Sequence, residues 1–372
     1  MIRRLSNRVL FLLVTVMLTA ACQWRDLDYD YINTADITVI FDWSQSGLKT
    51  KAQAVGAIEP GDRINGRTVA FYPVGGGDPI IKLSHSDTVN VNLLEGKYQA
   101  VFFNETFDDF DNIYFEGTEY FDQLRALAKS ERISRMRGEI DVAREPDLLA
   151  VDMMIPLEVT DEMVSYTRGV RSKSTKALEM SMGMTRMMLI EEQMTIRPVP
   201  RSVVYPVQVE VEVHGMDDIS SAGAYITGFA EGFDFSGNRP SDGTVIHKLT
   251  FSDTRFLDGS KTDGIMSGCL QTFGLRPGAG PLSGYTLEFR AVLINGEIYE
   301  ETRSIDDLIT EVTEDGIIRI NIHIGSDKLP DGSDTPIQIP DVEPVGGDNG
   351  MWKVDVGDWE EITVPVDFPS DK

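Results

Sequence analysis

The histidines of this 372-residue chain are the first residues to consider for chemistry, because general bases and zinc sites commonly use them. A zinc protease needs two histidines on one helix face in the pattern H-E-x-x-H. His85, His214, His247 and His323 are instead isolated from one another in the sequence. The nucleophile pattern G-x-S-x-G and the phosphate-binding pattern G-x-x-x-x-G-K-[ST] are absent as well. We therefore expect no catalytic residue and no enzymatic activity.

Acidic residues offer two further kinds of chemistry. Two neighbouring carboxylates could act as acid and base in glycoside hydrolysis, and three aspartates around Gly332 could bind calcium. With 60 Asp and Glu in the chain, a solvated acidic surface explains such pairs better, and the calcium loop departs from the usual spacing. We expect no metal site and no cofactor. The residues concerned are Glu191 with Glu192, Asp108 with Asp109, and Asp327, Asp331 and Asp334.

Sulfur-bearing and aromatic side chains form two clusters. Five methionines recur at a spacing that predicts one face of a strand, where they could ligate copper or haem but more often fill a core. Aromatic residues at Phe107–Asp111 and Tyr114–Phe115 could stack on sugar rings, although half-buried aromatics that anchor a sandwich edge are commoner. Both clusters therefore favour packing over ligand binding. The methionines are Met180, Met182, Met184, Met187 and Met188.

The first 21 residues have the pattern of a secretory signal peptide. Three arginines precede an apolar run over residues 9–18, which is too short for a transmembrane helix. The run ends in Thr19-Ala20-Ala21-Cys22, which resembles a bacterial lipobox with Leu18 one place further from the cysteine than is usual. We expect cleavage before Cys22, which would carry a diacylglycerol and an N-acyl lipid. The alternative is an ordinary cleaved signal peptide followed by an incidental cysteine.

The charge and cysteine content narrow the choice of partners. The chain has 34 Lys and Arg against 60 Asp and Glu, a net charge of −26, which becomes −29 without the three arginines of residues 1–21. Such a charge argues against nucleic acid as a partner, because phosphate binding needs a basic surface. The two cysteines cannot form a disulfide framework. Once Cys22 is lipidated, Cys269 has no partner, and we expect a buried, inert thiol.

Alternating apolar and polar residues, bounded by turn-forming residues, predict many short strands. The clearest is Tyr205–His214, in which valine alternates with polar residues. Thr88–Leu93 and Tyr98–Phe103 flank a glycine turn and are predicted to form a hairpin. Tyr285–Leu293 is predicted to form another through a type I′ turn at Asn295-Gly296. The other predicted strands are Ile37–Trp43, Thr68–Tyr72, Ala224–Phe229, Val245–Phe251, Gly268–Phe273 and Ile317–Ile324.

Helices are predicted at only two places. Thr118–Met136 has apolar residues at helical spacing, and Ile305–Val312 follows an S-x-x-D capping pattern. Short strands separated by turns favour an all-β fold of sandwiches. The predicted order is a signal peptide at 1–21, an N-terminal β-sandwich domain at 22–160, a polar linker at 161–177, a C-terminal β-sandwich domain at 178–329, and a Pro/Gly-rich tail with a terminal strand at 330–372.

Short segments spread over residues 22–365 carry a family resemblance. After the lipobox come Arg25–Asp30, the strand Val39–Trp43, Leu94–Tyr98 and Phe103-Asn104; the second half adds Ile196–Val199, His214-Gly215, Ile226–Ala230, Phe273–Leu275 and Asp355–Trp359. This order resembles the fimbrillin-like and fimbrial-anchor lipoproteins of the Bacteroidales, and among them an uncharacterised member. The resemblance implies two tandem transthyretin-like β-sandwich domains. It also implies subunits that join by strand addition, so that an open groove or an edge strand would be the functional site.

The resemblance further implies an outer-membrane lipoprotein facing outward, with fimbrial subunits as partners. Its role would be that of an anchor, an accessory protein or a minor subunit. No single arginine stands out as a cleavage site that would release a first strand, although Arg168, Arg171 and Lys173 are accessible in principle. A retained, membrane-bound lipoprotein is therefore favoured over a cleaved stalk subunit. The alternative is a surface lipoprotein that binds glycan or peptide on a passive β-sandwich scaffold.

Overall fold

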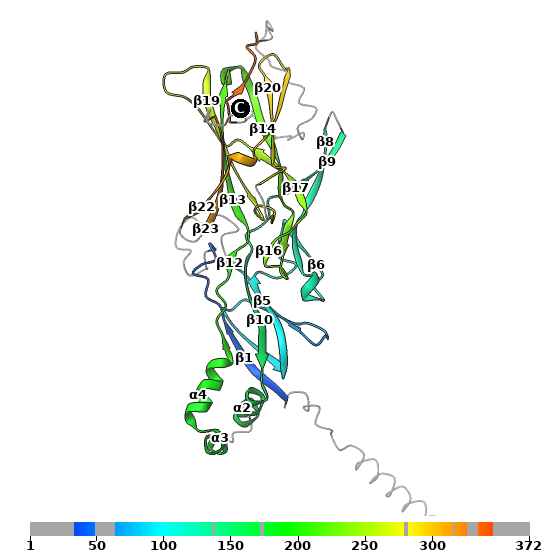
Figure 1. Cartoon of the computed structure of the whole chain (residues 1–372), viewed down its shortest axis with the longest axis vertical. Coiled ribbons are helices and arrows are strands. Elements are labelled where there is room, and N and C mark those ends of the chain that lie inside the picture. Colours follow the sequence, from blue (N-terminus) through cyan, green and yellow to red (C-terminus); the bar gives the residue numbers. More distant parts are fainter. Residues whose placement is uncertain are drawn as a thin grey trace, which may run out of the picture.

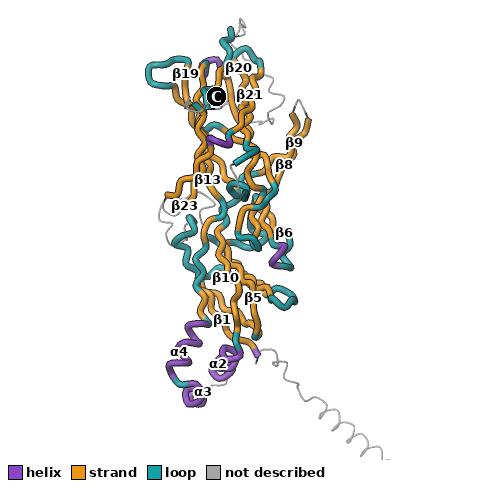
Figure 2. Tube along the Cα trace, viewed as in Figure 1, coloured by secondary structure: helices purple, strands orange, loops and turns teal. Residues whose placement is uncertain are grey.

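The computed structural model describes residues 33–48, 64–135, 138–171, 175–278, 282–314, 317–325 and 334–344. The signal peptide, Cys22 and the terminal strand predicted after Trp352 lie outside these residues. The described chain forms an elongated molecule made mostly of strands, with helices gathered at one end (Figures 1 and 2). No helix in these ranges is long and apolar enough to cross a membrane.

The first β-sandwich consists of a three-stranded sheet facing a five-stranded one. The smaller sheet has the order β11-β1-β4, and the larger has the order β12-β10-β5-β2-β3. Apolar side chains from both sheets, among them Ile37, Val69, Phe71 and Phe102, are buried in one core between them. The strands are β1 (Thr34–Ile40), β2 (Arg67–Pro73), β3 (Ile80–Ser84), β4 (Thr88–Leu94), β5 (Gly96–Asn104), β10 (Ala150–Val159), β11 (Thr195–Ile196) and β12 (Arg201–Ser202).

The second β-sandwich also has two sheets. One has the order β18-β19-β13-β23-β22, with β24 beside the end of β13; the other has the order β21-β20-β14-β17-β9-β8. The strands are β8 (Ser130–Arg135), β9 (Gly138–Ala143), β13 (Tyr205–His214), β14 (Ile219–Ala230), β17 (Thr244–Thr250), β18 (Asp253–Phe256), β19 (Asp263–Thr272), β20 (Thr286–Leu293), β21 (Ile298–Ser304), β22 (Ile309–Glu314), β23 (Ile317–Ile324) and β24 (Ile337–Gln338).

β13 shows how the sequence pattern produces this sandwich. Side chains of a strand alternate between the two faces of its sheet, so every second residue of β13 points into the core. Val207, Val209, Val211 and Val213 are fully buried there, while the polar residues between them face outward. The strongest strand predicted from the sequence is therefore confirmed, and it lies at the centre of its sheet.

A small sheet joins the two sandwiches. β6 (Ile113–Glu116) and β7 (Arg125–Ala128) come from the first half of the chain, and β15 (Gly232–Asp234) and β16 (Arg239–Pro240) from the second, in the order β16-β15-β7-β6. A third core lies beneath this sheet and combines Phe103 of β5 with Phe235 and Phe273 of the second half. All three rings are fully buried. A continuous apolar core of this kind holds the two sandwiches in one arrangement.

One predicted hairpin is confirmed and the other is wrong. β20 and β21 pair through the Asn295-Gly296 turn, but only Gly296 has a positive φ (82°), so the turn is not of type I′. β4, however, pairs with β1, whereas β5 pairs with β2 and β10 in the opposite sheet. The chain crosses from one sheet to the other at Gly96, whose φ of 153° favours glycine.

Both predicted helices are replaced by strands. Thr118–Met136 contains a single 3₁₀ turn, η3 (Phe121–Gln123), followed by β7 and β8, because pairing with β6, β15 and β9 outweighs the helical spacing. Ile305–Val312 contains the 3₁₀ turn η5 (Asp306–Leu308) and then β22. The Asp306 carboxylate accepts a hydrogen bond from the Tyr285 N–H (2.7 Å) and caps no α-helix.

The real α-helices lie where a polar linker and a methionine-bearing strand were expected. They are α2 (Asp161–Arg171), α3 (Thr175–Met182) and α4 (Met184–Gln193). α2 packs along β1, and Ile190 of α4 is buried in the first core. β11 and β12 then pair with β1 and β10. Residues 178–202 therefore belong with the first sandwich, and the second sandwich begins at β13 rather than at residue 178.

The methionine cluster lies on α3 and α4 and not on a strand. Met180, Met184 and Met188 are exposed, so the expectation that they fill a core is wrong for these three. Met182 is partly buried and packs against the first core. The spacing of the cluster fits a strand, but the helix between residues 184 and 193 turns alternate members outward.

Candidate functional site: the sheet edges

None of the four histidines lies in a catalytic arrangement within the described ranges. His85 follows β3, His214 ends β13 and His323 lies in β23. His247, on β17, is buried against Phe229, and burial lowers the pKa of its ring to about 4. No group of three or more potential metal-ligating side chains is found in that part of the chain either.

The other predicted site residues are equally dispersed. Asp108, Asp109, Glu191 and Glu192 are exposed, as a solvated acidic surface requires. Of the candidate calcium loop, only Asp334 lies among the described residues. Its carbonyl oxygen accepts a hydrogen bond from the Gly325 N–H (2.6 Å).

Cys269 differs from expectation, because it is exposed on the outer face of β19 rather than buried. Its pKa is raised by partial burial and then by the negative charge of Glu145, while Arg319 lowers it. A raised pKa reduces the fraction of reactive thiolate at neutral pH. We therefore still expect this thiol to be inert, because its pKa is raised and not because it is fully buried.

The aromatic residues proposed for sugar stacking mostly serve the core between the two sandwiches. Phe110 is buried, and Phe107 and Phe115 pack against the same core with their ring centroids 4.9 Å apart. Tyr114, on the opposite face of β6, is 39% exposed. The three phenylalanines therefore serve packing, as expected, but in the core between the sandwiches rather than at a sandwich edge.

Strand addition requires an edge strand whose outward backbone groups are free. β1 would be such an edge, because β11 covers only Thr38 and Val39. Two outward N–H groups of β1 are bonded to α2 and to the residue just before β11. The Asp36 N–H donates to Thr167 Oγ1 of α2 (3.0 Å), and the Thr38 N–H donates to the Met194 carbonyl (2.9 Å).

Charged side chains of α2 also hold this helix against β1. The guanidinium of Arg171 pairs with the Asp36 carboxylate, and that of Arg168 donates to Asn33 Oδ1 (2.9 Å). Arg168 and Arg171, considered above as cleavage sites, are thus held in a helix against β1. Thr167, which caps the edge, was missed at the sequence level because a side chain that caps a distant strand leaves no local pattern.

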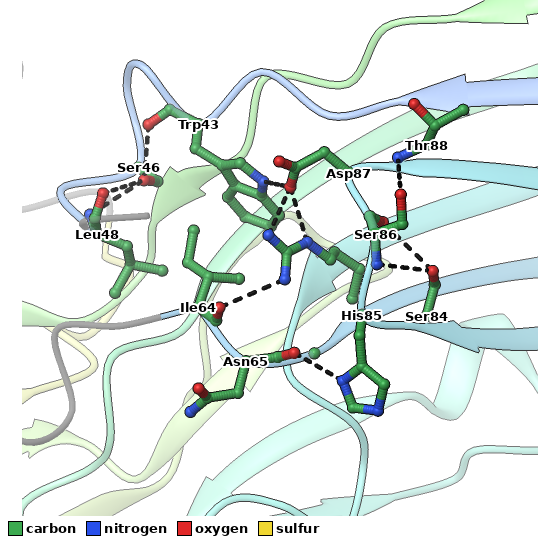
Figure 3. A network of polar contacts seen from close by, with 12 residues as sticks. Trp43, Ser46, Leu48, Ile64, Asn65, Ser84, His85, Ser86, Asp87 and Thr88 are labelled. Carbon is green, nitrogen blue, oxygen red and sulfur yellow. Dashed lines mark hydrogen bonds and ion pairs between the residues drawn. The ribbon is translucent and has the colours of Figure 1, made fainter. Parts of the chain in front are cut away.

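The end of β1 is fixed by a buried cation (Figure 3). Arg67 is 5% exposed, and its Nε donates to Asp87 Oδ1 (2.8 Å). Trp43 Nε1 donates to the same oxygen (2.9 Å), and the Arg67 guanidinium lies 5.8 Å from the Trp43 ring centre. An open pocket of about 630 Å³ adjoins this network. Its aromatic wall, Phe41 and Trp43, is buried, and Asp87 is paired with Arg67 and Trp43, so the network positions the chain at the end of β1.

Other edge strands are protected in different ways. The outer edge of β4 is blunted by Lys82, whose ammonium group donates to the Asn90 carbonyl, and by Tyr98, whose hydroxyl donates to the Leu94 carbonyl (3.0 Å). On β21, the Arg303 guanidinium donates to the carbonyl of Pro336 (3.3 Å) and to that of Thr335, which draws the segment before β24 against this edge. Covered and charged edges resist unwanted pairing.

β22 is an edge strand of the second sandwich. It pairs with β23 on one side, and among the described residues no strand pairs with its other side. Glu311, Val312 and Thr313 are exposed, and Val312 is an apolar side chain with 37% exposure. An exposed strand of six residues is long enough to accept another strand. Most of β22 was predicted as part of a helix, so no sequence pattern indicated this edge.

Comparison with known proteins adds a family and a fold. Residues 21–250 match the model of a domain of unknown function, DUF5119. No curated protein matches the chain. A Bacteroides ovatus protein described as a candidate adhesin is similar in structure, with 14% identity and a TM-score of 0.52 over 87% of this chain and 98% of that chain. This chain therefore has the same fold.

Two further solved structures are similar at a lower level. The fimbrial anchor protein Mfa2 of Porphyromonas gingivalis is 12% identical, with a TM-score of 0.39 over 72% of this chain and 82% of that chain. A candidate adhesin of Bacteroides thetaiotaomicron is 13% identical, with a TM-score of 0.41 over 70% of this chain and 79% of that chain.

Proposed function

The chain belongs to the DUF5119 family, and on that premise we propose that it is an outer-membrane lipoprotein that anchors or accompanies cell-surface fimbriae. Cys22 is the lipid attachment site, with a diacylglycerol and an N-acyl chain holding the protein at the membrane. Several acyl chains anchor stably where one is marginal. The partners are the outer membrane and fimbrial subunits, and the protein faces outward. The proposal includes no catalytic step and no cofactor.

The observation that carries this proposal is the position of the two ends of the molecule. β1, the first described strand, starts at the helical end, and the second sandwich lies away from it (Figure 1). A lipid on Cys22 would therefore fix the helical end near the membrane and hold the second sandwich away from it. The apolar core between the sandwiches makes the molecule stiff enough to transmit such an attachment.

The fimbrial partner would bind at β22 by strand addition. Main-chain hydrogen bonds to the open side of β22 would supply affinity, and side chains on either side of Val312 would supply selectivity. β1 is closed by α2 and β11, which agrees with a protein that keeps its first strand in place. This arrangement favours an anchor or accessory protein over a stalk subunit.

A matched pair of substitutions tests the site of partner binding. Val312→Lys places a charge on the open edge of β22, where it should oppose pairing. Ile298→Lys is the control, since Ile298 has the same exposure of 37% but lies on β21, in the other sheet of this sandwich. We expect fimbrial subunits to copurify with the native protein and with Ile298→Lys, and to be lost with Val312→Lys. Equal recovery with both variants would refute β22 as the binding edge.

One observation favours the alternative of glycan binding on a passive scaffold. An open pocket of about 530 Å³ near β6 and β7 is lined by carboxylates, an amide and a guanidinium, and Tyr114 lies two residues from its wall. Such groups can hydrogen-bond sugar hydroxyls while the tyrosine ring stacks. Binding of the purified protein to a glycan array, lost in Tyr114→Ala, would support this alternative. The lining residues are Glu116, Gly117, Asp122, Gln123, Arg125 and Asp234.

A further inference from the structure

The helical end of the molecule exposes a group of apolar side chains. On α3 and α4, Met180 is 86% exposed, Met184 and Met188 are each 66% exposed, and Leu189 is 50% exposed. Single exposed apolar residues are normal on a protein surface, but here four of them lie on two helices that contact each other, and gathered apolar residues mark interaction sites. We refer to these four residues as the methionine patch.

The packing of the helices explains why the patch faces outward. Ile190 of α4 and Met194 just after it are buried in the first core, so the opposite face of α4 must point away from the sandwich. Met184 and Met188 are four residues apart and therefore share that outer face. The exposed methionines of α4 are not needed for the core, because α4 already contributes Ile190 to it.

The charge around the patch differs from that of the rest of the chain. From the start of α2 to the end of α4, residues 161–193 contain five basic and five acidic residues, in a chain whose net charge is −26. Arg186 pairs with Glu162, and Arg171 pairs with Asp36, while Lys176 is exposed. The helical end therefore lacks the excess of negative charge that would keep the remaining surface away from anionic lipids.

The start of the chain places this end next to the membrane. Arg168 of α2 contacts Asn33, the residue directly before β1, so the helices adjoin the point where the described chain begins (Figure 2). Ten residues separate Cys22 from Asn33. Fully extended, they span at most about 40 Å. A lipid on Cys22 would thus confine the methionine patch to a short distance from the bilayer.

We propose that the methionine patch rests on the lipid surface, with the side chains of α3 and α4 inserted at the headgroup level and Lys176 facing the lipid phosphates. Exposed apolar side chains flanked by basic residues are what interfacial helices use. The contact would set the orientation of the rod on the membrane, which a flexible lipid tether alone cannot do. This inference rests on the proposed attachment of lipid to Cys22.

Vesicle binding by protein without acyl chains tests the inference separately from the proposed function. The chain from residue 22 onward, carrying Cys22→Ser, is mixed with vesicles of phosphatidylethanolamine and phosphatidylglycerol, and the bound fraction is measured by sedimentation. Replacing all four patch residues by serine should lower the partition coefficient at least about tenfold. The matched control replaces Val74, Leu83 and Phe256 by serine. These residues are 49–55% exposed and lie outside the three helices. It should bind as the parent does.

Two results would overturn the inference. The first is a parent protein that does not sediment with vesicles, and the second is a patch variant that binds as well as the control. Circular dichroism and the thermal midpoint verify that the patch variant is folded. Neither vesicle result depends on lipidation or on β22. A failure of the proposed function would appear instead as unmodified Cys22 or as copurification that Val312→Lys does not affect.

Discussion

Thr167→Val tests whether α2 is the cap that closes the edge of β1. The Asp36 N–H donates to Thr167 Oγ1 at 3.0 Å, and Thr167 is 2% exposed, so water cannot easily replace the lost acceptor. Leaving a buried donor without a partner costs about 1–2 kcal/mol. Since 1.4 kcal/mol is a factor of ten, the protection of the Asp36 amide against hydrogen exchange should fall about 5- to 30-fold.

The assay is amide hydrogen exchange resolved at single residues, with two controls. Thr167→Ser keeps the hydroxyl and should retain most of the protection at Asp36. The Phe41 N–H, which donates to the Asp87 carbonyl on the other side of β1 (2.9 Å), reports on the sheet itself and should change little. The reasoning would be refuted if Thr167→Val left Asp36 unchanged, or if Asp36 and Phe41 lost protection equally.

Three further predictions concern groups whose environment the fold determines. Asp87→Ala leaves the buried Arg67 guanidinium without its carboxylate; because Asp87 is half exposed, urea unfolding should show a loss of about 2 kcal/mol, less than for a fully buried pair, and an unchanged midpoint would contradict this. The folded-state pKa of His247, about 4, lies below its ordinary 6.5. The contribution of the neutral ring to the free energy of unfolding is therefore fully present above pH 6.5 and is lost as the pH falls toward 4. Between pH 7 and 4.5 this amounts to about 2 kcal/mol, and in denaturant titrations His247→Leu should lack that part of the pH dependence; identical pH profiles would show that burial of His247 is not responsible. Cys269 should react with iodoacetamide several-fold more slowly than a peptide cysteine at pH 8, and Glu145→Gln should speed it up; no acceleration would remove Glu145 from the explanation.

The sequence predicted those elements whose pattern is local. The alternation of valines identified β13, and Asn295-Gly296 identified the β20–β21 hairpin, because side-chain period and turn residues act between near neighbours. The all-β sandwich fold follows from many such segments. The partners of β4 and β5 were not predictable in this way, since pairing across a sandwich depends on residues distant in the sequence.

The helical segment shows a signal that was available and outweighed. Residues 175–193 are rich in Met, Leu and Glu, which favour helices, whereas the spacing of the methionines favoured a strand. Propensity was the better guide here because three of the five methionines are exposed and do not face a core. The open edge of β22 and the hydroxyl of Thr167 had no such signal, because each becomes a feature only when the sheets assemble.

Attachment of the protein to the cell surface through Cys22 can be tested by mild protease treatment of intact cells that express the native chain or Cys22→Ala. We expect the native protein to fractionate with the outer membrane and to be digested on intact cells. We expect Cys22→Ala to leave the membrane fraction and to escape digestion. A native protein that is protected from protease on intact cells, or a Cys22→Ala protein that stays in the membrane fraction and is digested like the native one, would contradict the account.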